Sequence, residues 1–191
     1  IDAQIKKLIR DAIAAANKKT AAANVKSNPK TTAAEKKAIE SSTKIVLTPE
    51  GKIVSDNFKS NKGRLPWPVE NGAITLGYGD QPHPIFKSFT VHNSGIEITT
   101  DSGSNARAVF AGEVTQVQVL TPLKKAVVVK HGDFFTVYQN LSSVSVQAGD
   151  KVSIKQTLGK IRTDGDGRTI LKFIISQNTT YFNPKLWLSA R

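Results

Sequence analysis

The hydrophobic pattern of the chain changes near Gly63, and this change limits the possible fold more than any other feature of the sequence. Before it, residues 1–62 are rich in Ala and Lys and contain a single aromatic residue, Phe58. After it, residues 63–191 hold most of the Gly, Pro and aromatic residues. Segments of such different composition predict a helical arm over 1–62 and a β domain over 63–191.

The start of the arm carries one apolar helical stripe. Its members follow the three- and four-residue spacing of an amphipathic helix: Ile1, Ile5, Leu8, Ile9 and Ile13. Such a stripe needs an apolar partner, and we expect the arm to be the end of a coiled coil or a regulatory helix. A truncated linker is the alternative.

Two further helix starts can be read from the arm. Thr32 and Glu35 have the spacing of a capping box. Thr48-Pro49-Glu50 has the order of an N-cap, a first-turn proline and a first-turn acid. The helix that follows is expected to dock on the β domain through Ile53, Val54 and Phe58.

The β domain is predicted from short runs rich in Val, Ile, Phe and Thr that are separated by glycines. Examples are residues 113–120, 126–130, 134–138 and 171–175. Strand-sized runs at intervals of about 8–12 residues are typical of an antiparallel β-sandwich or half-barrel with little room for helices.

Charge and composition exclude several functions. The net charge of +12 favours a negatively charged partner, such as phosphate, anionic lipid or an acidic protein face. The lysines lack the interleaved aromatics that stack bases, so nucleic acid is not expected.

The absence of Cys excludes disulfides, thiolate zinc sites and cysteine nucleophiles. The apolar runs are too short for a transmembrane segment. A chain that begins at Ile1 and has no Met is expected to be a mature product or part of a longer protein.

Five short motifs follow one another in the β domain. They are Gly77-Tyr78-Gly79 with His83-Pro84, Asn93-Ser94-Gly95-Ile96-Glu97-Ile98, Lys130-His131-Gly132 with Tyr138-Gln139-Asn140-Leu141, Gly149-Asp150-Lys151-Val152, and Ile170-Leu171-Lys172-Phe173. In this order the motifs resemble the lysostaphin/LytM-type zinc metallopeptidase family of peptidoglycan hydrolases, over residues 64–188.

The resemblance covers the scaffold and not the metal ligands. In that family zinc is held by the His and the Asp of a His-x-Gly-Ile-Asp-Ile motif and by the second His of a His-x-His pair, and two further histidines lie near the activated water. The corresponding positions here are Asn93, Glu97, Lys172, Ile170 and Asn140. Catalytic zinc needs about three good protein ligands and an open position, which these side chains do not supply. The resemblance therefore implies a pseudoenzyme without catalytic residues, metal or cofactor.

The geometry of strands supports the same conclusion. Alternate residues share a face, so Asn93 and Glu97 point together, as do Ile170 and Lys172. We expect an ion pair between Glu97 and Lys172 to replace the zinc site. A β-bulge that brings His92 into the site is the alternative.

The two other histidines, His83 and His131, match family positions outside the ligand set. A lone His beside Gly at a strand end is more often a hydrogen-bonded turn residue than a ligand.

The implied function is regulatory. Family members without zinc ligands resemble EnvC-type LytM factors, in which a coiled-coil arm precedes a degenerate peptidase domain that activates cell-wall amidases. The resemblance implies a periplasmic or cell-envelope protein that activates an N-acetylmuramoyl-L-alanine amidase in peptidoglycan remodelling and daughter-cell separation. Its groove, at Asn93, Glu97, Asn140, Ile170 and Lys172, would bind a helix of the amidase or be covered by the arm helix that carries Ile53, Val54 and Phe58. The alternatives are a non-catalytic peptidoglycan-binding module and an active zinc metalloendopeptidase.

Overall fold

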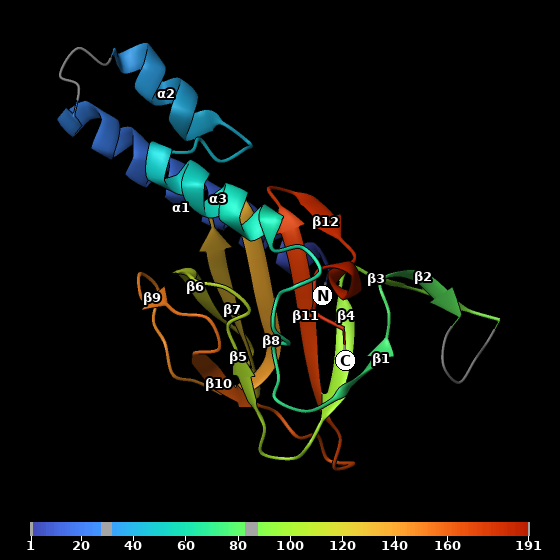
Figure 1. The fold of residues 1–191 in the computed structure, drawn as a ribbon. Helices are drawn as coiled ribbons and strands as arrows, with labels where there is room; N and C mark the ends of the chain where they lie inside the picture. The colour runs from blue at the N-terminus through green and yellow to red at the C-terminus, as the bar shows by residue number, and fades with distance from the viewer. Residues whose placement is uncertain (1, 28–31, 83–87, 191) are drawn as a thin grey trace.

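The computed structural model describes residues 2–27, 32–82 and 88–190, so His83 lies outside the described residues. Three helices precede the strands, as Figure 1 shows. The elements are α1 (Asp2–Ser27), α2 (Ala33–Ser41), α3 (Pro49–Ser60), β1 (Ala73–Leu76), β2 (Gly79–Pro82), β3 (Thr90–Asn93), β4 (Ile96–Thr100), β5 (Asn105–Arg107), β6 (Gly112–Thr121), β7 (Lys124–His131), β8 (Phe134–Val144), β9 (Lys151–Val152), β10 (Thr157–Ile161), β11 (Thr169–Gln177), β12 (Thr180–Phe182) and the 3₁₀ turn η1 (Pro184–Leu186).

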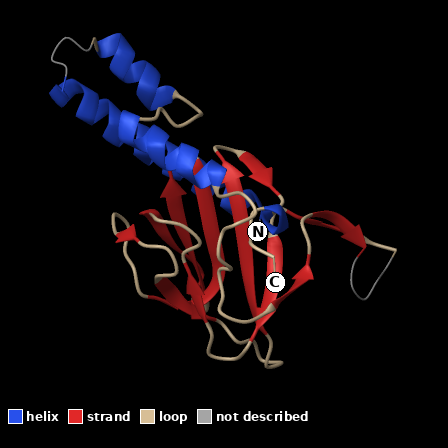
Figure 2. Ribbon diagram, viewed as in Figure 1, coloured by secondary structure: helices blue, strands red, loops and turns tan. Residues whose placement is uncertain are grey.

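One large sheet forms the body of the molecule. Ten strands take part, in the main order β1-β4-β11-β8-β7-β6-β9, and β5, β10 and β12 pair at the side. All of its strand pairs are antiparallel, which confirms the predicted mainly β, antiparallel fold. The helices gather at one end of this sheet, and the hairpin of β2 and β3 projects at its side (Figure 2).

The helix starts that were read from the sequence are confirmed. Thr32 accepts a hydrogen bond from the Glu35 amide, and the Glu35 carboxylate accepts one from the Thr32 amide. Thr48 accepts from the Gly51 amide, with Pro49 in the first turn. These caps satisfy amide groups that would otherwise lack partners.

The larger core lies on the inner face of the sheet. Because side chains alternate along a strand, Leu171, Phe173 and Ile175 of β11 all point to this face. There they pack with Ile96 and Ile98 of β4 and with other fully buried side chains.

Part of the outer face of the sheet is also buried, where α1 packs on it. The α1 stripe of Ile5, Leu8, Ile9 and Ile13 packs on four sheet residues. These are Val128, Phe135, Val137 and Ile174. The predicted coiled-coil end is therefore wrong within the described residues, because the stripe finds its apolar partner in the same chain.

The helix α3 is part of the β domain. Phe58 is fully buried in the inner core, between Phe110, Phe134 and Trp187. The domain boundary between residues 62 and 63 remains a prediction from sequence composition. In the structure, α3 lies before this boundary but packs on the sheet that follows it.

Asn17 holds the arm in place. Its buried side chain donates to the carbonyls of Ser42 and Lys44 and accepts from the Val46 amide. The same segment reaches the sheet, where the Ile45 amide donates to the side chain of Asn178 at 2.8 Å. Within the described residues, no helix combines the length and the apolar composition that a membrane span requires.

Candidate functional site

The predicted site residues of β4 and β11 lie side by side. Lys172 is directly opposite Glu97 on one neighbouring strand and opposite Gln139 of β8 on the other. All three side chains point to the outer face of the sheet, because their neighbours in sequence are in the inner core. We call this surface the Lys172 face. Gln139 was not among the site residues predicted from the sequence. A signal was present, because a residue two positions after Val137 in the same strand must point to the same face as Val137.

The register predicted for Glu97 and Lys172 is present, but the predicted ion pair is not. Among the ion pairs between described residues, none joins the Glu97 carboxylate to the Lys172 ammonium. Both residues are only half-buried. A pair of such exposure gains about 1 kcal/mol at most, so cross-strand neighbours need not pair.

Asn93 serves the backbone. It is 1% exposed, and its amide donates to the Gly77 carbonyl at 2.8 Å. Its oxygen accepts from the Gly95 amide at 3.4 Å. The side chain therefore ties the Gly-rich turn before β2 to the start of β4.

Asn140 and Ile170 are also brought together. The Asn140 amide donates to the Ile170 carbonyl at 2.7 Å. Asn140 has a φ of 68°, a left-handed conformation that Asn tolerates better than most residues, and the register of β8 shifts next to it. The predicted site residues therefore lie on the neighbouring strands β4, β11 and β8, apart from Asn93, which ends β3 in the separate two-stranded sheet.

These side chains do not fit a catalytic zinc ion. Asn93 uses its amide group on the backbone at Gly77 and Gly95. Asn140 donates to a carbonyl, and Ile170 has no donor atom. Lys172 is cationic, which leaves Glu97 as the one good ligand at the family positions. Among the described residues, no group of three or more His, Cys, Asp or Glu side chains is placed to hold a metal ion.

His92 lies away from the Lys172 face. It sits on β3, paired with Asp80 of β2, and its Nδ1 is 2.6 Å from Asp80 Oδ1. Both side chains are largely exposed. The alternative that a bulge carries His92 into the site is therefore not supported by this register.

His131 is a buried structural residue, as its sequence context suggested. Its Nδ1 lies 2.7 Å from the Ala111 carbonyl and its Nε2 lies 2.9 Å from the Thr136 hydroxyl. Because a carbonyl only accepts, Nδ1 carries the proton and Nε2 accepts from Thr136. Burial lowers the pKa of His131 to about 4, although the Ala111 hydrogen bond raises it.

The expected covering helix is on the other side of the sheet. Phe58 is in the inner core, Ile53 is 61% exposed, and Val54 lines a separate cavity. The prediction that α3 lies over Lys172 is wrong for this reason: its one large buried side chain packs in the core that contains Phe173. The helix that lies on the Lys172 face is α1, over Ile174 and its neighbours.

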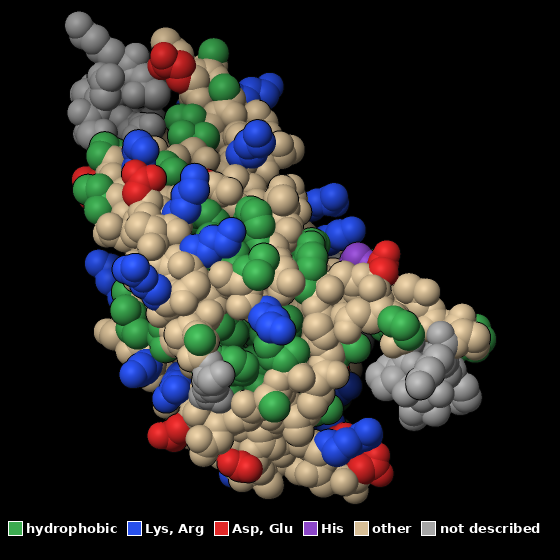
Figure 3. Space-filling model, turned by 45° about the vertical axis from the view of Figure 1, so that its right-hand side comes forward, with side chains coloured by type: hydrophobic (Ala, Val, Ile, Leu, Met, Phe, Trp, Pro, Cys, Tyr) green, Lys and Arg blue, Asp and Glu red, His purple; other side chains and the backbone are tan. Residues whose placement is uncertain are grey.

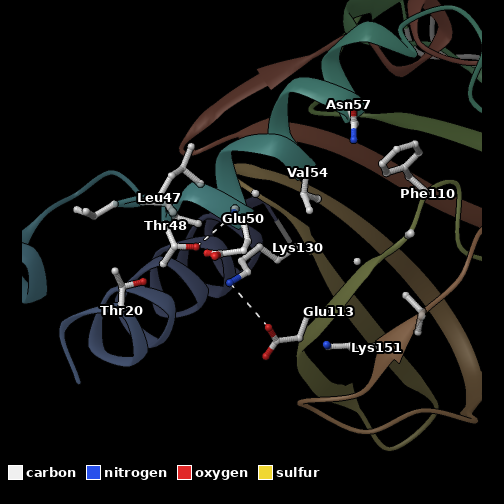
Figure 4. A pocket seen from close by; sticks show the side chains of 17 residues that line it. Thr20, Leu47, Thr48, Glu50, Val54, Asn57, Phe110, Glu113, Lys130 and Lys151 are labelled. Atoms are coloured by element: carbon white, nitrogen blue, oxygen red, sulfur yellow. Dashed lines mark hydrogen bonds and ion pairs between the residues drawn. The ribbon is translucent and has the colours of Figure 1, made fainter. Parts of the chain in front are cut away.

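A cavity of about 600 Å³ separates the arm from the sheet near β6 and β9. Figure 4 shows Leu47, Val54 and Phe110 among its lining residues. Lys130 and Glu113, which lie opposite each other on β7 and β6, also line it, with 3.9 Å between the ammonium and the carboxylate. Glu113 also pairs with Lys19 of α1 at 2.7 Å. These charges compensate one another, and they help to hold α1 on the domain.

Positive charge is spread widely over one face of the molecule. Figure 3 shows Lys and Arg side chains over much of one face, with hydrophobic side chains gathered in its middle. On this face, the positive charge that contributes to the net charge of +12 is not confined to one cleft.

The fold and the site together define a peptidase-like domain whose metal positions carry other side chains. Residues 91–184 match the family model of Peptidase family M23. The match to this LytM-type family agrees with the resemblance that the motifs suggested.

Similar proteins support the same fold. An uncharacterized protein of Haemophilus influenzae is 32% identical over 96 residues, which make up 49% of this chain and 23% of that protein. The matched stretch is thus less than a quarter of that relative. A chain from the crystal structure of the SpoIIIAH and SpoIIQ complex is 26% identical, with a TM-score of 0.53 over 63% of this chain and 97% of that one. The catalytic domain of a mutant of the prophage-encoded M23 protein EnpA from Enterococcus faecalis is 23% identical, with a TM-score of 0.51 over 63% of this chain and 94% of that one.

Proposed function

We propose that this chain is a non-catalytic LytM factor that binds and activates a cell-wall amidase in peptidoglycan remodelling. One observation carries the proposal: the Lys172 face continues into a surface that already holds an amphipathic helix, α1. A face that accepts the α1 stripe has the shape and apolarity to accept a helix of a partner.

The residues at the metal positions favour a binding role. Asn93 and Asn140 hold the backbone, and Lys172 and Glu97 offer opposite charges side by side. Such a surface can orient a partner that carries both charges, and it lacks the ligands for hydrolysis. The structural similarity to a chain of the SpoIIIAH and SpoIIQ complex is consistent with a LytM-type domain that works by binding another protein.

The position of α1 suggests regulation. A partner helix that needs the surface over Val137 and Ile174 must displace α1 first. The apparent affinity then falls in proportion to the fraction of molecules in which α1 has moved away. Periplasmic or cell-envelope localisation and a role in daughter-cell separation belong to the same proposal.

The first test measures binding of the chain to purified N-acetylmuramoyl-L-alanine amidase by calorimetry. The second measures how much dye the amidase releases from labelled peptidoglycan with and without the chain. We expect Lys172→Glu to weaken binding at least tenfold, because it places two carboxylates opposite each other. Lys185→Glu, at an exposed site on η1, is the matched control and should bind as the original chain does.

Other outcomes contradict the proposal. Sedimentation with isolated peptidoglycan, without amidase binding, would favour a glycan-binding module. Dye release by the chain alone, with added zinc, would show an enzyme.

A further inference from the structure

The tip of the β6–β7 hairpin exposes aliphatic side chains to solvent. Val119 is 56% exposed and Leu123 is 65% exposed. Pro122 between them is exposed as well. Single exposed apolar residues are common, whereas three at one turn form a compact apolar tip.

Lysines surround this tip. Lys125 lies directly opposite Val119, and Lys124 lies opposite Thr121, in the hairpin register. Lys7 of α1 lines the same small recess as Val119. Within the described part of the chain, none of these three lysines takes part in an ion pair. Of the described residues that line this recess, Asp11 is the one acid.

The two features fit one kind of partner. Aliphatic side chains that stand out from a turn can enter the boundary between headgroups and acyl chains, and lysines around them attract anionic headgroups. An acidic protein would use the lysines but would need an apolar pocket for Leu123. A soluble polyanion would use the lysines alone.

We propose that the β6–β7 hairpin tip, with Lys7, Lys124 and Lys125, docks the chain on the surface of an anionic phospholipid bilayer. The contact is peripheral and reversible, because the apolar part consists of three small side chains. Its hairpin residues differ from those of the proposed amidase function, which uses β4, β8 and β11, and only Lys7 lies on α1, the helix that an amidase would displace. Figure 1 shows β6 and β7 away from β4 in the sheet order.

The test is co-sedimentation of the full chain with vesicles of phosphatidylglycerol and phosphatidylcholine, compared with phosphatidylcholine alone. We expect binding to the anionic vesicles only. The double variant Lys124→Glu/Lys125→Glu should lower the partition coefficient by at least about 25-fold, at roughly fivefold for each lysine. Leu123→Ser should lower it severalfold, whereas Ile154→Ser, at a site elsewhere on the surface that is 48% exposed, should leave it unchanged.

A second measurement separates insertion from simple charge attraction. The chain has no Cys, so Leu123→Cys creates a unique site for an environment-sensitive dye. We expect a blue shift of that dye on anionic vesicles and none at Ile154→Cys. The proposal is overturned by absence of vesicle binding, by a Leu123→Ser variant that binds as tightly as the original chain, or by a dye that stays in water. If polyglutamate abolishes vesicle binding equally for the original chain and for the Leu123→Ser variant, the lysines alone account for the binding. An acidic partner would then replace the bilayer.

Discussion

The ring of Phe58 on α3 stacks on the imidazole of His131 at the end of β7, with 4.8 Å between ring centroids and 15° between their planes. This contact joins the arm to the sheet at a point where His131 is fully buried. Next to it, Ser55 of α3 hydrogen-bonds to Asp133, and Asp133 also accepts from the Gln177 side chain at 2.8 Å. The turn of His131, Gly132 and Asp133 is therefore the seat of α3.

Loss of the Phe58 ring is expected to destabilise the whole domain. Phe58→Ala should lower the free energy of unfolding by about 3–5 kcal/mol, because it leaves a cavity between Phe134 and Trp187. Ile53→Ala, on the exposed side of the same helix, should change it by less than about 0.5 kcal/mol. Urea denaturation of both variants checks this. Equal effects at the two positions would contradict the packing of α3 described above.

His131 is expected to make stability depend on pH. Its pKa is about 4 in the folded chain and 6.5 without burial, so between these values the unfolded chain binds more protons. Stability therefore rises with pH through this window and is lost as the pH falls from 6.5 towards 4. The shift corresponds to about 3 kcal/mol. Urea denaturation from about pH 4 to 7 should show this slope, and His131→Gln should flatten it. A slope that is unchanged in His131→Gln would assign the effect to other groups.

Features that depend on a few neighbouring residues could be predicted from the sequence. The caps at Thr32 and Thr48 involve partners three residues away, and the α1 stripe follows from helical periodicity. The strand register that places Glu97 opposite Lys172 followed from the motifs.

Features that depend on the partner of a surface could not be predicted in this way. Periodicity shows that the α1 stripe is buried but not against what. A signal was present, because Ala126–Val129 is a continuous apolar run, which is typical of strands with both faces covered. The ion pair expected between Glu97 and Lys172 is absent among the described residues for a different reason, since register sets which residues are neighbours but not which charges pair.

Gly132 is expected to be the least replaceable residue of the seat of α3. It has a φ of 73°, and a Cβ there would lie 2.5 Å from Ser55 Cβ and 2.6 Å from the Gly51 carbonyl oxygen. Gly167 has a similar φ of 77° with nothing within 4 Å of a Cβ, so Gly167→Ala measures the backbone strain alone, about 1–2 kcal/mol. Gly132→Ala should lower the free energy of unfolding by about 1–3 kcal/mol more than Gly167→Ala does, because the added methyl group overpacks this contact. Equal losses of unfolding free energy in the two variants would show that α3 is not seated there.

Asn17 is expected to control access to the Lys172 face. Asn17→Ala removes three hydrogen bonds to the segment 42–46, so α1 should leave the sheet more often. If α1 competes with the partner, amidase binding should tighten in this variant, and hydrogen exchange in β8 should speed up. Replacement of Asn57, an exposed residue of α3, by Ala is the control. Faster exchange with unchanged amidase affinity would separate the arm from the binding surface.

Zinc binding is expected to return when the family ligands are restored. The combination Asn93→His, Glu97→Asp and Lys172→His places two imidazoles and a carboxylate at the positions that hold zinc in the resembling family, and positions 97 and 172 already lie opposite each other. This variant should retain about one zinc ion per chain after dialysis, measured by mass spectrometry, because three protein ligands and one open position suit this metal. The variant with only Glu97→Asp and Lys172→His lacks one ligand and should retain much less. The original chain should retain no stoichiometric zinc, since Asn93 is engaged with Gly77 and Lys172 is cationic. Zinc in the original chain would contradict the assignment of these positions and would make His92 a ligand to be tested next.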